Sequence, residues 1–248
     1  MEWTDDAIVL SLRGHGESSG ILETLTAAHG RHLGLVHGAT SPKRRAMLQP
    51  GNRVSLTWRA RISENLGVFV VELARERAHA LFEHRASLTG VSAFAAVANA
   101  VLPEREPHRP AFEGGEVLLE AIAEHGFADW IPLYVRWEAG LLEELGFGLD
   151  FRTCAATGTT ENLIYVSPRS GRAVSMEPGE AYRDRLLALP PFLLGRQDAA
   201  PTPEDLFAGL KLTAHFLDHF VLAPHSKSIP EARQRLSDLA ARNANESL

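Results

Sequence analysis

The sequence places three adjacent cations, Lys43, Arg44 and Arg45, in a Gly-, Ser- and Pro-containing stretch that we expect to be a loop from residue 38 to 52. Clustered ammonium and guanidinium groups bind phosphates, and several of them together bind the backbone of a polyanion. A short basic run is more often only a solvated loop. Alone, this run is a weak indication of an anion-binding site.

The following residues strengthen this indication. In residues 53–61 apolar and polar side chains alternate, and successive side chains of a strand point to opposite faces. The pattern predicts a strand that buries Val54, Leu56, Trp58 and Ala60 and exposes Arg53, Arg59 and Arg61. With the basic loop and Arg31, these arginines predict one basic surface for a nucleic-acid backbone. Because Trp58 points inward and exposed aromatic residues are scarce, we expect backbone binding with little sequence preference.

Signs of catalysis are weak. His215 and His219 have the i, i+4 spacing of a metal-binding pair on a helix, but the glutamate of an HExxH motif is absent between them. The chain contains no GxxxxGK[ST] or GxGxxG phosphate cradle and no GxSxG nucleophile motif. We therefore expect no catalysed reaction. A hydrolase using the two histidines is the least favoured alternative.

The charge is distributed unevenly along the chain. The net charge is −6, which argues against a uniformly basic nucleic-acid binder. Residues 1–80 carry ten Lys and Arg against eight Asp and Glu, a net +2, whereas residues 81–248 carry 15 against 23, a net −8. The basic excess is therefore local to the first third of the chain.

We expect a cytoplasmic protein that does not contact a membrane. The N-terminus is acidic where a signal peptide is basic, and Cys154 is the only cysteine, which excludes an intramolecular disulfide. The longest charge-free run, residues 86–103, contains Ser, Thr, Asn and Gly and indicates a buried helix of a soluble protein.

Two kinds of periodicity divide the chain and predict an α+β protein. Five strand-like segments are expected at residues 7–13, 21–28, 31–37, 53–62 and 68–73. Five short strands suit a small closed β-barrel, with an OB-fold as the leading candidate and a small sandwich or SH3-like barrel as alternatives. We place this domain at residues 1–80.

Residues 81–248 predict an all-helical domain. Apolar residues recur at helical spacing from Leu88 to Leu102, from Val117 to Ile122 and from Ile131 to Leu145, with Asp129 as the expected N-cap of the third helix and Gly146 as its stop. Further helices are expected at residues 180–189, 203–222 and 230–241. The stretch 150–178 is rich in Thr, Gly and Ser and has little helical period.

Three segments resemble the bacterial RecO family of recombination mediators. Residues 38–50 resemble its basic loop, and residues 135–148 (VRWEAGLLEELGFG) resemble its helix motif R-F-E-x-x-L-L-x-x-L-G-Y, followed as in the family by Cys154. Residues 228–236 (SIPEARQRL) resemble its closing Pro-, Ser- and Arg-containing helix. The motifs are individually loose, but their order and spacing match and the resemblance covers nearly the whole chain.

The resemblance implies a function and partners. It implies an N-terminal OB-fold, a helical C-terminal domain, binding of single- and double-stranded DNA, annealing of complementary strands, and loading of recombinase onto DNA coated with single-strand-binding protein. The implied partners are RecR and the acidic C-terminal tail of single-strand-binding protein. In the family, a basic residue at the position of Arg136 lies beside an apolar pocket for that tail. A surface ion pair of Arg136 with Glu143 or Asp129 is the alternative.

The chain departs from the family at its metal site. Many members hold zinc with two Cys-x-x-Cys pairs, whereas the matching positions here are Cys154, Thr157, Ser175 and Pro178. We expect no structural zinc and no other cofactor, and a degenerate zinc-ribbon-like insertion at residues 150–178. A protein-interaction adaptor without a direct DNA role is the main alternative function.

Overall fold

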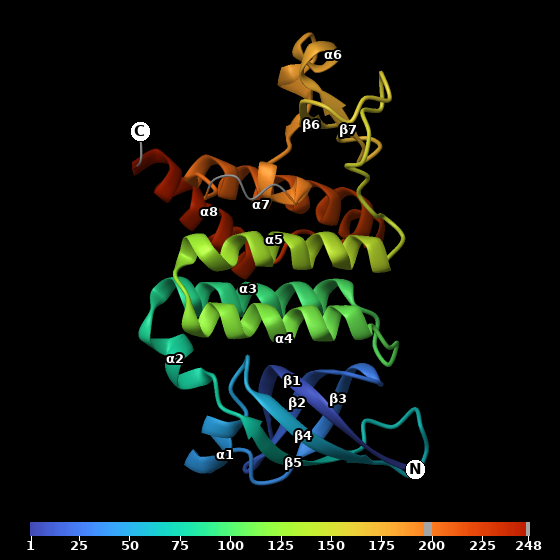
Figure 1. The fold of residues 1–248 in the computed structure, drawn as a ribbon. Helices are drawn as coiled ribbons and strands as arrows, with labels where there is room; N and C mark the ends of the chain where they lie inside the picture. Colours follow the sequence, from blue (N-terminus) through green and yellow to red (C-terminus); the bar gives the residue numbers. More distant parts are fainter. Residues whose placement is uncertain (196–199, 247–248) are drawn as a thin grey trace. The chain divides into compact units, whose positions relative to one another are not determined.

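The computed structural model describes residues 1–195 and 200–246 and divides into two compact units, Met1–His125 and Gly126–Leu248 (Figure 1). We expected the boundary at residue 80, where the strand period ends. The structure instead groups the barrel with the helices that follow it, up to His125. The reason is tertiary packing, because helices in residues 85–124 cover the barrel and pair their carboxylates with its arginines.

The first unit begins with the five predicted strands. They are β1 (Glu2–His15), β2 (Ser19–Thr26), β3 (Gly30–Val36), β4 (Arg53–Arg59) and β5 (Val68–Arg75). These strands form a closed barrel in the order β1-β2-β3-β5-β4, in which β3 and β5 close the ring in parallel and the other pairs are antiparallel. The prediction of five strands and a closed barrel is confirmed.

The barrel interior follows from the alternation seen in the sequence. Val54, Leu56 and Trp58 of β4 are buried while the intervening residues are exposed or half-buried. Their core also holds Phe69 of β5, whose ring lies over Gly34, where a Cβ atom would collide with it. The apolar face of β4 is thus where we predicted it.

Four helices complete the first unit, namely α1 (Pro42–Met47), α2 (Ala78–Glu83), α3 (Arg85–Val101) and α4 (Arg109–Glu124). Helix α1 lies within the stretch that we expected to be a loop, because the Ser41 hydroxyl caps its first turn and Pro42 starts it. Figure 1 shows α3 and α4 running side by side, and they contact β1 and β2 respectively.

Helix α4 is also joined to the barrel by charge. The buried guanidinium of Arg77 binds Glu116 at 3.0 Å and Glu120 at 3.3 Å. The first unit is therefore a barrel and a helical layer that share one electrostatic network.

The second unit contains the other long helices and two short helical segments that follow α7. They are α5 (Phe127–Glu144), α7 (Pro203–Phe216), a π-helical continuation η3 (Leu217–Leu222), the short 3₁₀ turn η4 (Ala223–His225) and α8 (Glu231–Glu246). The helices predicted from residues 131, 203 and 230 onward are confirmed. Gly126, not Asp129, is the N-cap of α5, and Asp129 lies in its first turn. Gly146 follows the end of α5 with φ +86°, as a stop residue should.

A small sheet lies between α5 and α7 in the sequence. It consists of β6 (Leu163–Val166), β7 (Ala173–Ser175) and β8 (Leu187–Ala188), with α6 (Met176–Glu180) and the 3₁₀ turns η1 (Arg183–Arg185) and η2 (Pro191–Leu194) beside them in the chain. The helix predicted at residues 180–189 is wrong, because Leu187 and Ala188 pair with β6 as an edge strand. Such pairing overrides a short helical pattern.

Within the part of the chain that the structure describes, one apolar helical stretch meets the length and composition of a membrane span. It covers Pro203–His225, and half of its most apolar window is buried inside the structure. Its first part, α7, packs against α5 and α8.

Candidate nucleic-acid interface

The strongest basic cluster is on α1. Lys43 and Arg45 are exposed and Arg44 is half-buried, and none of the carboxylates in the described residues lies within ion-pair distance of these three. Lys43 and Arg44 line a cleft of about 650 Å³ whose other wall includes Val71 and Leu73 of β5. Glu72 and Glu76 also line this cleft. The α1 cations are therefore available to bind an anion, in a cleft that also contains apolar and acidic side chains.

The basic face predicted for β4 is largely neutralised. Arg53 points to the expected face, but it binds Asp6 of the neighbouring strand β1 at 2.7 Å and Glu116 of α4 at 3.2 Å. The side-chain hydrogen bond to Asp6, and then Glu116, raise the pKa of Arg53 above its ordinary value. The sequence pattern showed no acid within the strand, but the acids come from elements that are distant in sequence.

Arg31 has a structural role. Its side chain is only 14% exposed, and it binds Glu23 of β2 and lies 3.7 Å from Glu104. It also donates a hydrogen bond of 2.8 Å to the carbonyl of Leu102, at the end of α3. The expectation that Arg31 adds a free charge to the basic surface is therefore wrong.

Arg59 and Arg61 differ from each other. Arg59 is exposed and lies 2.9 Å from Glu2, an equally exposed partner. Arg61 lies beyond the end of β4, which stops at Arg59, so it does not belong to the strand face on which we placed it. It is exposed and follows the strand in the turn leading to β5.

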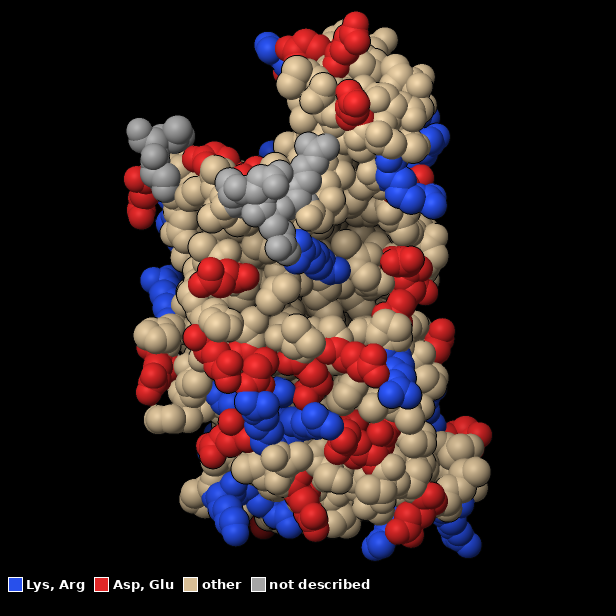
Figure 2. Space-filling model, in the orientation of Figure 1, with Lys and Arg blue, Asp and Glu red and all other residues tan. Residues whose placement is uncertain are grey.

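The predicted continuous basic surface therefore breaks into separate parts. In Figure 2 the Lys and Arg atoms over the barrel and α4 lie among Asp and Glu atoms. Of the seven residues predicted for this surface, Lys43, Arg44 and Arg45 of α1 and Arg61 are the ones without a carboxylate partner among the described residues.

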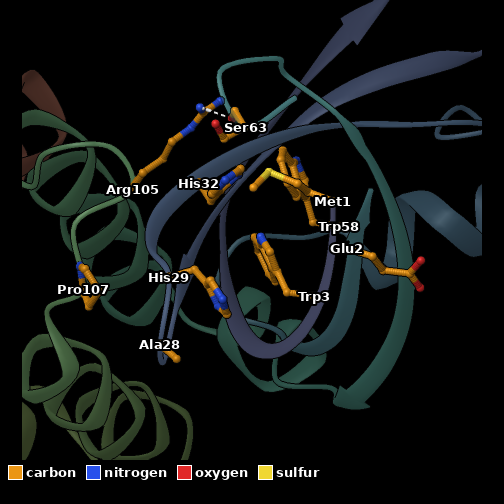
Figure 3. Close-up of a pocket in the computed structure, with 10 residues that line it drawn as sticks. All are labelled: Met1, Glu2, Trp3, Ala28, His29, His32, Trp58, Ser63, Arg105 and Pro107. Carbon is orange, nitrogen blue, oxygen red and sulfur yellow. Dashed lines mark hydrogen bonds between the residues drawn. The ribbon is translucent and has the colours of Figure 1, made fainter. Parts of the chain in front are cut away.

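The sequence analysis missed an aromatic pocket on the barrel (Figure 3). It has a volume of about 480 Å³ and is lined by Trp3, His29, His32, Trp58 and Arg105, among others. These residues come from three strands, a turn and the loop before α4. Only Trp58 drew attention in the sequence, as an inward residue. The others are separated in the chain and show no common spacing.

Arg136 lies exposed on α5. Its guanidinium donates a hydrogen bond of 2.7 Å to the carbonyl of Phe192, and it forms no ion pair with Asp129 or Glu143 among the described residues. A carbonyl leaves the charge of the guanidinium unneutralised. A cleft of about 290 Å³ in the same unit is lined by Leu187, Phe207 and Lys211, among others, and Arg136 is not one of its lining residues.

Three of the four positions that match zinc ligands in the family meet around Cys154. The Cys154 sulfur accepts hydrogen bonds from the backbone N–H and the hydroxyl of Ser175, at 3.2 and 3.3 Å. Burial raises the pKa of the Cys154 thiol. Hydrogen bonds from Ser175, Thr157 and the backbone lower it by more, so that the pKa is about 6. Neutral hydrogen-bond donors therefore surround the Cys154 sulfur and favour its deprotonated form.

The rings of His215 and His219 stack at 4.2 Å between centroids. The Nε2 of His215 lies 3.0 Å from the Pro168 carbonyl, and the Nδ1 of His219 lies 2.9 Å from the His215 carbonyl. Within residues 1–195 and 200–246, no group of three or more His, Cys, Asp or Glu is arranged to hold a metal ion.

Comparison with known proteins assigns both halves of the chain to one family. The family model described as "Recombination protein O N terminal" matches residues 1–75, and "Recombination protein O C terminal" matches residues 83–228. The gap between these matches lies at our predicted boundary.

Individual relatives agree over nearly the full length. A "DNA repair protein RecO" of Rhodospirillum centenum is 53% identical over 240 residues, covering 96% of this chain and 94% of the relative. Proteins of the same name from Phenylobacterium zucineum and Caulobacter vibrioides are 51% and 48% identical, covering 96% and 97% of this chain and 97% and 98% of the relatives. The chain therefore belongs to the RecO family of DNA repair proteins.

Proposed function

We propose that this protein is a recombination mediator of the RecF pathway of DNA repair. It binds single- and double-stranded DNA, anneals complementary strands and helps to load recombinase onto DNA coated with single-strand-binding protein. The barrel holds strands by neutralising phosphates, which reduces their mutual repulsion while they pair. No bond is made or broken by the protein itself. It works in the cytoplasm, away from membranes, and uses no cofactor.

The observation that carries this proposal is the α1 cluster. Lys43, Arg44 and Arg45 present positive charge from one side of a five-stranded barrel, in a chain that belongs to a DNA repair family. The strand number and order support an OB-fold, a barrel type that binds oligonucleotides through its sheet and loops. The contacts around Cys154 support a degenerate zinc ribbon. With Arg31 and Arg53 paired internally, α1 is the principal phosphate-binding element, and Arg59 and Arg61 are secondary.

Salt dependence tests the electrostatic part. If about four phosphates are neutralised, the logarithm of affinity for a labelled single strand falls with the logarithm of salt at a slope of about −3. Fluorescence anisotropy over a salt series measures this slope. A slope near zero, or no binding to the oligonucleotide, contradicts DNA binding and favours the adaptor alternative.

Charge removal locates the surface. Replacing Lys43, Arg44 and Arg45 with Ala is expected to weaken binding to all sequences alike and to reduce the salt slope by about 2. The matched control replaces three exposed arginines of the second unit, Arg169, Arg172 and Arg185, and so changes the net charge equally. Equal loss in both variants indicates a general charge effect and contradicts the assignment of α1.

We also propose that the second unit docks RecR and the acidic tail of single-strand-binding protein, with Arg136 binding the terminal carboxylate. A guanidinium binds a carboxylate through two parallel hydrogen bonds. Arg136→Ala is expected to weaken binding of a tail peptide while DNA affinity stays unchanged. The comparison variant is Lys211→Ala, because Lys211 lines the cleft of the same unit that also contains Phe207. Loss of peptide binding only in Lys211→Ala moves the tail site to that cleft.

A further inference from the structure

The aromatic pocket of the barrel is lined by none of the α1 cations, and several of its lining residues are aromatic rings. We propose that it receives one unpaired nucleobase of a single strand. This inference rests on the proposed DNA binding. It adds a site that distinguishes an unpaired base from a paired one.

Stacked rings form one wall of the pocket. The Trp3 and His29 rings are 3.9 Å apart between centroids and within 5° of parallel, and Trp58 continues the series at 5.7 Å and 21° from Trp3. Figure 3 shows Trp3 between His29 and Trp58. The His29 side chain is 35% exposed. A planar base can extend this series, since base–aromatic stacking tolerates any base.

The His32 ring supplies a polar group at the same pocket. His32 is buried, and its Nδ1 lies 3.0 Å from the carbonyl of Leu33, which can only accept a hydrogen bond. Burial lowers the pKa of His32, so the ring is neutral at neutral pH. Nδ1 then carries the proton and Nε2 is an acceptor, which suits the amino or imino edge of a base.

One guanidinium at the rim can attract the phosphate of a bound nucleotide. Arg105 is exposed, and its guanidinium donates to the carbonyls of Ser63, Glu64 and Asn65, which do not neutralise it. Arg105 has φ +62°, an uncommon backbone conformation for a residue other than glycine. Such conformations cluster where a side chain must be held in one position for function.

Several carboxylates near the pocket have cationic or histidine partners. Glu2 binds Arg59 at 2.9 Å, and Glu104 lies 3.7 Å from Arg31. Asp5 binds His29 of the pocket wall at 2.8 Å, which fixes the orientation of that ring. The pocket volume of about 480 Å³ lies within the range of small-molecule sites and admits one base with its sugar. Flat stacked rings and a cationic rim together match single-stranded nucleic acid.

The position on the barrel extends the proposed DNA path. In Figure 1 the N-terminus, which lines the pocket, and α1 lie on opposite sides of the barrel. A strand bound by both therefore crosses the barrel. A paired base cannot enter the pocket, so the site contributes to single-strand binding and not to duplex binding.

The test compares three labelled probes of equal length by anisotropy: an oligothymidine, the same backbone without bases, and a duplex. Trp3→Leu keeps an apolar side chain at this position but removes the central ring. We expect it to weaken oligothymidine binding about tenfold, with less than about a twofold change for the abasic and duplex probes, whose binding comes from phosphates alone. Trp3→Phe retains a ring and is expected to restore affinity within about twofold of the wild type.

A second variant covers loss of folding. Trp3 packs against the barrel core, whereas His29 is not part of that core cluster and its side chain is 35% exposed. His29→Leu is therefore made in parallel, and each variant's melting temperature is compared with the wild type. His29→Leu is expected to show the same selective loss. Equal weakening of all three probes, or of none, by the variant that retains its fold overturns the base pocket while leaving DNA binding intact.

Two further results separate the pocket from its alternatives. No binding of any probe by the wild type overturns the proposed function, and the base pocket with it. Competition of oligothymidine by a Phe-ended acidic peptide, lost in both Trp3→Leu and His29→Leu, assigns the pocket to a peptide and overturns the nucleobase as its occupant.

Discussion

Glu138 and Arg233 form an ion pair that is fully buried in the second unit. Arg233 binds both carboxylate oxygens of Glu138, at 2.6 and 2.9 Å, and donates further hydrogen bonds to Ser237 and the Leu210 carbonyl. The pair joins α5 to α8, and Arg233 lies in the closing segment that resembles the family motif. This ion pair stabilises the fold only while both partners are present, because each charge compensates the other inside the protein.

Removing one partner leaves a buried charge. Glu138→Ala is expected to lower the free energy of unfolding by about 3–5 kcal/mol, because the Arg233 guanidinium loses its counter-charge without gaining water. Urea denaturation followed by circular dichroism measures the change. The control is Glu231→Ala, which breaks the exposed pair with Arg235 and is expected to cost less than about 1 kcal/mol. Similar losses in the two variants would show that the buried pair has no special weight.

The Cys154 thiol makes stability depend on pH. Its folded-state pKa of about 6 is below the ordinary value, so its stabilising contribution is complete above the unfolded-state pKa and is lost as pH falls through 6. We expect the wild type to gain stability relative to Cys154→Ala as pH rises from about 6 to 9.

Thiolate absorbance provides a direct measurement of the same group. It should titrate near pH 6 in the wild type and at higher pH in Ser175→Ala, which lacks the hydroxyl donor. An unchanged titration in Ser175→Ala would show that this hydrogen bond does not lower the pKa.

At the scale of elements, the turn between β2 and β3 determines how the loop before α4 lies against the barrel. Gly30 has φ +68°, and a Cβ atom there would overlap the backbone of Glu106, in the loop that carries Arg105. The close approach requires glycine for two reasons, its backbone conformation and the absence of a side chain.

The two reasons can be separated with a second glycine. Gly16 has nearly the same φ, +64°, but a Cβ atom there meets nothing within 4 Å. Gly16→Ala is expected to cost about 1 kcal/mol for backbone strain alone, and Gly30→Ala about 2–4 kcal/mol because the loop must also move. Thermal and urea unfolding of both variants measures the difference. An equal loss of unfolding free energy in the two variants would mean that the loop around Glu106 moves aside without an energetic cost.

At the scale of the whole molecule, the grouping of barrel and helices predicts which fragment folds. Arg53 and Arg77 of the barrel segment bind Glu116 and Glu120 of α4, and Gly115 of α4 approaches Phe94 and Ile8 closely. A fragment of residues 1–125 is expected to unfold cooperatively on heating, because it retains these partners.

A fragment of residues 1–80 is the comparison. It exposes the apolar side of β1 and leaves Arg77 without its carboxylates, so we expect it to lack a cooperative transition or to melt at a much lower temperature. Dispersion of amide signals in NMR spectra and thermal melts distinguish the two fragments. Equal stability of both would place the functional boundary at residue 80.

Local patterns in the sequence sufficed for much of the fold. Alternation in residues 53–59 determined which side chains of β4 are buried, and helical spacing located α3, α4, α5, α7 and α8. These patterns are reliable because each element must bury one face, and the period shows that face directly. The prediction of a helix at residues 180–189 was wrong because a short apolar run suits either a helix or an edge strand.

The candidate site was predicted only in part. The α1 cations are accessible as expected, since three neighbouring charges need no tertiary contact to be close together. The pairing of Arg31 with Glu23 and of Arg53 with Asp6 and Glu116 could not be read from the strand pattern. The residues of one strand do not indicate which side chains of neighbouring elements will contact it.

The sequence by itself determined the family, the five strands, most of the helices and the basic segment, because motifs and periodicity are local properties of the chain. Only the tertiary structure decided which arginines are neutralised, that α3 and α4 belong with the barrel, and that Trp3, His29, His32 and Arg105 share one pocket. The physical reason is that burial, ion pairing and stacking act between residues that are near in space, and closing a barrel brings together residues that no sequence spacing relates.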